Sequence, residues 1–241
     1  QPKNSKEQYG FSIEHIGFTQ KSLSKSEIQY GDRPYASAIM LKSFVIVIDT
    51  IHKTRFVSSL NIGVIGPGAF GKEMQVGIHK ATGNVIPQGW HNQINNDLVF
   101  NYELNHEKQF YYNKAFSLQS NANIRLGTLY TDASLGFNFT LGIINNPFTI
   151  TKSKKFQVYL YCQPLINIIG YDATLQGGLL NDKSPYIILA KDLERLVYQV
   201  NYGVVIQTKK MYFEYLRTHS TNKFTSGVAP SWGGIKIGVK F

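Results

Sequence analysis

The sequence predicts an all-β fold, an antiparallel transmembrane β-barrel of about ten to twelve strands with a short helix in one long loop. Three observations predict it. Apolar and polar residues alternate along most of the chain, many predicted strands exceed the usual length in soluble proteins, and Tyr and Phe gather near strand ends. We expect a single domain over residues 1–241, because no linker, repeat or low-complexity tract divides the chain.

The alternation gives each predicted strand an apolar face and a polar face. One apolar face carries Phe137, Phe139, Leu141 and Ile143, with Asn138, Thr140 and Gly142 between them. The same pattern runs through residues 55–64, 98–105, 116–126, 196–202 and 235–241. In a soluble barrel or sandwich the apolar face forms the core, whereas in a membrane barrel it meets lipid and the polar face lines a lumen. Strand length, aromatic content and the closing Phe241 favour the membrane barrel.

A membrane barrel must close, because backbone groups at an open sheet edge find no hydrogen-bond partner in lipid. We therefore expect the first and last strands to pair with each other, or another segment to fill the gap between them. No apolar run reaches the roughly 18 residues that a membrane-spanning helix needs.

The composition points to an anionic partner. The chain has 25 Lys and Arg against 15 Asp and Glu, a net charge of +10, which suits a phosphorylated glycolipid or an acidic surface. No nucleic-acid motif accompanies the charge, so we predict a lipid or membrane partner and no nucleic acid. The single cysteine, Cys162, excludes an internal disulfide and a Cys-based zinc site.

The segment 66–93 interrupts the run of strands. Its Gly-Pro-Gly start and a possible C-terminal Gly83 predict a short helix over Glu73–Lys80, which would place Gln75 and His79 on one face. Imidazole acts as a general base near neutral pH, and a glutamine amide orients water or donates to an oxyanion. Spacing alone is weak evidence for catalysis and favours a structural role for His79.

Several motifs in a fixed order carry a resemblance to a known family. They are Asp32-Arg33-Pro34-Tyr35-Ala36, Gly66-Pro67, Gln75-x-x-x-His79, Pro87-x-Gly89-Trp90-x-x-Gln93, Tyr171–Gly178 and Arg217-Thr218. Together they resemble the outer-membrane lipid A 3′-O-deacylase family, over nearly the whole chain from about Tyr9.

The resemblance implies a barrel of about twelve strands in the outer membrane of a Gram-negative bacterium. It also implies calcium-dependent hydrolysis of the 3′-acyloxyacyl ester of lipid A in lipopolysaccharide. His79 matches the family's catalytic base and Gln75 its active-site glutamine. Arg33 stands where members carry a cation for the anionic substrate, and we expect Trp90 to be a second substrate contact.

Asp32 is the one calcium-ligand candidate that the motifs supply. A structural role competes with this assignment, since an Asp-Arg pair at a strand entrance also orders a rim loop.

Two parts of the family pattern are not found. Members begin with a strand bearing an Asn-Asp pair and a Tyr-Thr-Asn-Gly-like segment, and neither precedes Tyr9. Some members also carry an acidic residue just before the Pro-x-Gly-Trp turn, where this chain has Val85 and Ile86. Either N-terminal strands are absent from this sequence, or the protein has lost catalysis and kept the barrel.

Three functions therefore stay open. The first is a lipid A ester hydrolase. The second is a catalytically degenerate barrel that acts as a structural or accessory subunit of an outer-membrane complex. The third is a small pore or adhesin-like barrel.

Overall fold

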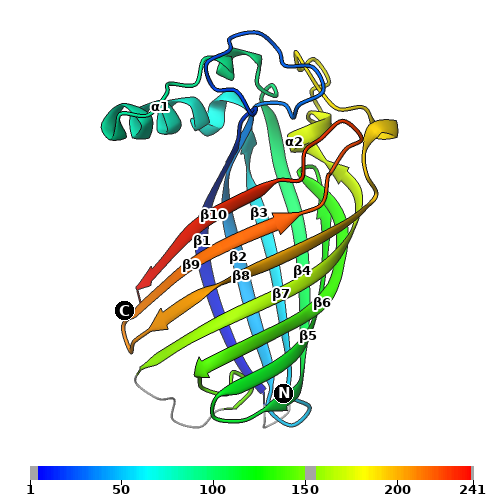
Figure 1. Cartoon of the computed structure of the whole chain (residues 1–241). Helices are drawn as coiled ribbons and strands as arrows, with labels where there is room; N and C mark the ends of the chain where they lie inside the picture. Colours follow the sequence, from blue (N-terminus) through cyan, green and yellow to red (C-terminus); the bar gives the residue numbers. More distant parts are fainter. Residues whose placement is uncertain (1–4, 150–155, 240–241) are drawn as a thin grey trace.

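The protein is a single antiparallel sheet that curls into a barrel-like wall (Figure 1). The computed structural model describes residues 5–149 and 156–239, so the predicted terminal Phe241 lies outside the described residues. The strands are β1 (Ser5–Phe18), β2 (Ala36–Asp49), β3 (Thr54–Ile65), β4 (Asp97–Tyr112), β5 (Phe116–Gly127), β6 (Tyr130–Ile143), β7 (Gln157–Asp172), β8 (Leu196–Gln207), β9 (Met211–Ser220) and β10 (Ser231–Val239). Their order in the sheet is their order in the chain, which confirms the predicted fold class.

The two edges of the sheet are β1 and β10. Over the described ranges, β1 pairs only with β2 and β10 only with β9. The direct pairing of first and last strands that we expected is therefore not present there. The alternative, in which another segment fills the gap between these edges, stays a prediction.

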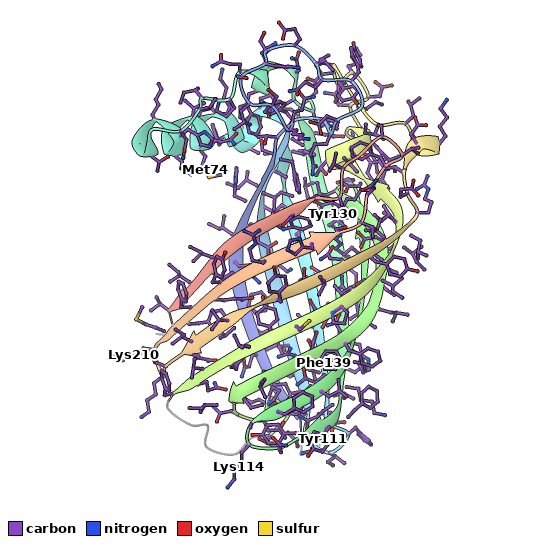
Figure 2. All side chains as sticks on the ribbon, viewed as in Figure 1. Met74, Tyr111, Lys114, Tyr130, Phe139 and Lys210 are labelled. Carbon is purple, nitrogen blue, oxygen red and sulfur yellow. The ribbon has the colours of Figure 1, made fainter. Side chains whose placement is uncertain are left out.

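The wall is apolar outside and polar inside. Leu135 and Leu141 on β6 are 64% and 58% exposed, whereas Asn121 on β5 and Asn101 on β4 are 5% and 2% exposed. Figure 2 shows Phe139 on the outer side of the wall and Tyr111 near the end opposite the helix α1. This arrangement is the inverse of a soluble barrel and is the one expected when lipid surrounds the wall.

Charged residues inside the wall are paired. Glu107 on β4 is 5% exposed, forms an ion pair with Arg55 and accepts hydrogen bonds from Asn121 (3.3 Å) and Asn138 (3.1 Å). These partners replace the water that the carboxylate loses on burial.

Removing the Glu107 carboxylate leaves these partners unsatisfied. We expect Glu107→Leu to lower the free energy of unfolding by about 3 kcal/mol, measured by urea unfolding of the detergent-solubilised barrel. The matched control is Glu14→Gln, because the Glu14 side chain is 45% exposed in its pair with Lys42, and such pairs contribute about 1 kcal/mol or less. Equal losses in the two variants would contradict the assignment of Glu107 to a buried network.

The two longest connections, β3–β4 and β7–β8, share one end of the barrel (Figure 1). They contain η1 (Pro67–Ala69), α1 (Gly71–Thr82), η2 (Gly89–Asn92), α2 (Ala173–Gln176) and η3 (Ala190–Asp192). Beneath these loops an apolar cluster closes the barrel interior with Ala36, Ala38, Met40, Ile65, Ile94, Val99, Leu129 and Ala173. None of the helices in the described ranges is long and apolar enough to cross a membrane.

Candidate active site on the helix α1

The helix α1 is the longest helix in the part of the chain that the structure describes, and it carries Gln75 and His79. It runs two residues beyond the predicted Glu73–Lys80 at each end. Gly83 ends it in the left-handed conformation, with φ of +68°, as the sequence predicts. This reversal turns the chain back over the last helical turn, where His79 lies.

The His79 ring is held by the segment that follows the helix. Its Nδ1 lies 2.5 Å from the carbonyl oxygen of Val85. Because a carbonyl oxygen only accepts hydrogen bonds, Nδ1 carries the proton and donates it. The neutral ring therefore presents Nε2 as its basic nitrogen, the tautomer that a general base needs.

The Gln75 side chain is oriented by Trp90. The indole Nε1 of Trp90 donates a hydrogen bond to Gln75 Oε1 over 2.8 Å. The carbonyl side of the amide is thus engaged, which leaves the Gln75 NH₂ group free to donate elsewhere. Gln75 and His79 lie one helical turn apart, so this donor and the basic Nε2 share one face of α1.

Trp90 is a buried anchor at the base of this helix. Its side chain is 2% exposed, and its ring centroid lies 5.1 Å from that of Tyr35. The first helical residue, Gly71, gives it room, because a Cβ there would lie 2.9 Å from the indole and 2.3 Å from Ser37 Cβ. The role of Trp90 as a substrate contact stays a prediction; the structure places its indole against protein.

Arg33 lies in the loop between β1 and β2, with its guanidinium engaged inside the molecule. It stacks 3.7 Å from the centroid of the Phe18 ring and donates from Nη2 to Thr174 Oγ1 over 3.2 Å. Burial lowers the pKa of Arg33 to about 10, against the opposing effect of Asp172. The side chain is therefore cationic at neutral pH. No hydrogen bond or ion pair in the described ranges joins it to Gln75, His79 or Trp90.

Asp32 orders the same loop through its carboxylate. Oδ1 accepts from the Arg33 backbone N–H (2.7 Å) and Oδ2 from that of Lys21 (2.6 Å). Across residues 5–149 and 156–239, no three His, Cys, Asp or Glu side chains gather closely enough to hold a metal ion. Calcium, and Asp32 as its ligand, stay predictions that come from the family resemblance.

The roles of three residues in the site were not predicted from the sequence. Tyr35 and Gly71 shape the pocket for Trp90, and the Val85 carbonyl fixes the His79 tautomer. Gly71 follows the glycine-rich run Gly66–Gly68, but a glycine at a helix start does not by itself indicate which group approaches it. The contact of the Val85 carbonyl with His79 could not be predicted, because every residue has a backbone carbonyl.

A family model described as "Outer membrane protein LpxR" matches residues 1–241. The chain belongs to the LpxR family. This assignment confirms the resemblance to lipid A 3′-O-deacylases and shows an outer-membrane barrel of the deacylase-like type. The loop end that carries α1 is then the extracellular end, because outer-membrane barrels place their long loops outside and their short turns in the periplasm.

A solved structure from the same family supports the fold. LpxR from Salmonella typhimurium matches with a TM-score of 0.79 at 19% sequence identity, over 98% of this chain and 84% of that one. At this identity the likeness shows the fold alone. No curated protein sequence gives a significant match to the chain.

Proposed function

We propose that this LpxR-family barrel hydrolyses the 3′-acyloxyacyl ester of lipid A, with His79 as the general base. The observation that carries the proposal is the pair of fixed side chains on α1. The Val85 carbonyl holds the proton on Nδ1 of His79, and Trp90 holds the carbonyl side of Gln75. One face of the helix therefore presents a base beside a free amide donor, the two groups that ester hydrolysis requires.

The reaction follows from these two groups. His79 Nε2 takes a proton from water, and the resulting hydroxide attacks the ester carbonyl carbon. The Gln75 NH₂ group donates to the oxygen that becomes negative in the tetrahedral intermediate. The intermediate then expels the sugar 3′ oxygen, which receives the proton from the imidazolium. The products are a free acyloxyacyl acid and lipid A with a 3′ hydroxyl.

A basic groove beside the loops supports an anionic glycolipid as substrate. A cavity of about 1020 Å³ lies between residues 19–33 and 223–231. Its lining carries four cationic side chains against two carboxylates, those of Glu27 and Asp32; the cations are Lys21, Lys25, Arg33 and Lys223. Such a cluster attracts phosphate groups, as lipid A carries. In this proposal Arg33 contributes charge from the floor of the groove, where Thr174 and Phe18 hold it.

The alternative is a degenerate barrel that serves a larger outer-membrane assembly. One observation favours it: Val85 and Ile86 stand where some family members carry an acidic residue. This alternative predicts that the barrel binds lipopolysaccharide or a partner protein and leaves lipid A intact.

Mass spectrometry of lipid A separates these functions. Purified protein is incubated with lipid A in two parallel reactions, one with calcium and one with a calcium chelator. The masses of the released acid and of the remaining lipid are then measured. We expect loss of the 3′ acyloxyacyl group, and the resemblance implies that the chelator stops it. Unchanged lipid A in every arm would support the degenerate barrel instead.

Trp90→Phe tests the orientation of Gln75. The variant keeps an aromatic ring in the pocket and removes the donor to Gln75 Oε1. We expect kcat for lipid A deacylation to fall about tenfold, the effect of one lost hydrogen bond, with KM unchanged. Tyr35→Phe is the control, because it removes a hydroxyl from the same pocket and leaves the Gln75 contact in place. A Trp90→Phe variant as active as the wild type would show that Gln75 needs no such support.

A further inference from the structure

The helix α1 exposes a stripe of large apolar side chains. Met74 and Ile78 are spaced four residues apart and lie on one side of the helix, and Phe70 immediately precedes the first helical residue. The side chains of Phe70, Met74 and Ile78 are 62%, 45% and 53% exposed. Charged residues occupy the other side, where Lys72, Glu73 and Lys80 are also exposed. The helix is therefore amphipathic, with its apolar side not covered by any described part of the chain.

Phe70 shows that this exposure is costly. It precedes the first helical residue with φ of 59°, in the left-handed region that bulky residues rarely adopt. Burial of the ring would offset this cost, yet the ring is 62% exposed. A surface outside the chain must cover the ring if it is to contribute to stability.

The position of α1 identifies that surface. Figure 1 shows the helix beside the extracellular end of the barrel, projecting outward beyond the wall and roughly across the strand direction of β1. In Figure 2, Met74 lies on the side of the helix that faces the level of the strands. His15 on β1 binds the carbonyl oxygen of Ala69 over 2.8 Å and so ties the start of the helix to the wall.

The wall below the helix is the lipid-facing surface of β1. Tyr9, Phe11 and Ile13 on this strand are each 75% exposed. The apolar stripe of α1 thus continues the surface that the outer membrane already covers. A helix with one apolar and one lysine-bearing side, lying across the barrel at this height, fits the boundary between acyl chains and headgroups.

We propose that α1 is an interfacial helix, with Phe70, Met74 and Ile78 inserted into the outer leaflet of the membrane that surrounds the barrel. Lys72 and Lys80 then point to the lipid phosphates. This placement does not depend on the proposed reaction. Its consequence for substrate access rests on that reaction. On a helical wheel Gln75 and His79 follow Met74 and Ile78 by about 100°, so the ester of a membrane-bound lipid would approach them from the side of the helix.

A fluorescent probe at two positions of α1 tests the proposal. Ile78→Cys and Lys80→Cys are made in a Cys162→Ser background, labelled with a polarity-sensitive nitrobenzoxadiazole dye and reconstituted in dioleoylphosphatidylcholine vesicles. Some vesicles contain a phosphatidylcholine spin-labelled near the glycerol end of its acyl chain. Both positions are exposed and lie on opposite sides of one helix, so each is the control for the other.

We expect the probe at position 78 to emit at shorter wavelength and to lose most of its fluorescence to the spin-labelled lipid, since interfacial helices lie about 5–10 Å deep. The probe at position 80 should be quenched by aqueous iodide. Equal iodide quenching at both positions would overturn the proposal. Protection at position 78 without quenching by the lipid would show that protein, either a second copy or another segment, covers the helix there, and would overturn the proposal too. These fluorescence measurements need no catalytic activity, so their result does not depend on whether the protein hydrolyses lipid A.

Discussion

We expect His79→Ala to remove most of the release of the 3′ acyl group from lipid A. Loss of a general base lowers the rate by about 10²–10⁴-fold, and no other described side chain on this face of α1 replaces an imidazole whose proton the Val85 carbonyl fixes. The measurement is the initial rate of acid release, followed by mass spectrometry under the conditions that give the highest wild-type rate.

His91→Ala is the matched control for this result. His91 lies in the same loop, is exposed, and its Nδ1 also lies within hydrogen-bond distance of a carbonyl oxygen, that of Gln88 at 3.1 Å. It lies outside α1, so we expect a near wild-type rate. Equal losses in both variants would indicate damage to the loop, and unchanged release in His79→Ala would remove the base from the mechanism.

The second large effect is expected from Gly71→Ala. The added Cβ would lie 2.3 Å from Ser37 Cβ and 2.5 Å from Ser37 Oγ, distances that require α1 or β2 to move. Since Trp90 and Gln75 meet at the base of this helix, the shift pulls them apart. A displacement of about 1 Å at reacting groups lowers a rate about 10²-fold. We expect that loss in kcat, with the barrel still folded on a heat-modifiability gel.

Gly77→Ala makes the same chemical change in the same helix. A Cβ at Gly77 meets nothing within 4 Å, and alanine favours the helix by up to about 1 kcal/mol over glycine. We expect unchanged or slightly higher stability and a wild-type rate. If Gly71→Ala and Gly77→Ala behave alike, the close approach at Gly71 does not position the site.

The wall of the barrel was predictable because the alternation of apolar and polar residues within each strand shows which of its faces meets lipid. The alternation around Phe139 fixes which side meets lipid, and its neighbours in the sheet repeat the same choice, so local pattern and tertiary structure agree. The helix was predictable for a similar reason, since Gly83 marks its end locally. Closure was not, because pairing between β1 and β10 depends on the sheet's total curl and on any segment between them.

The site was predictable only in part. The spacing of Gln75 and His79 indicates a shared face, but it does not show that Trp90 donates a hydrogen bond to Gln75. The loop contacts of Arg33 with Phe18 and Thr174 join three separate loop and strand ends, which a linear pattern does not reveal. Long-range contacts between loops therefore decided what the local motifs left open.

In the proposed reaction, this barrel hydrolyses lipid A through the basic nitrogen of His79. The most direct measurement is deacylation in water enriched in heavy oxygen, with calcium present and with His79→Ala run beside the wild type. We expect the released acyloxyacyl acid to gain one heavy oxygen atom and the lipid A product to keep its unlabelled 3′ oxygen. We expect the variant to release acid about 10²–10⁴-fold more slowly. Intact lipid A with the wild-type protein, or label in the sugar rather than the acid, would contradict the proposed reaction.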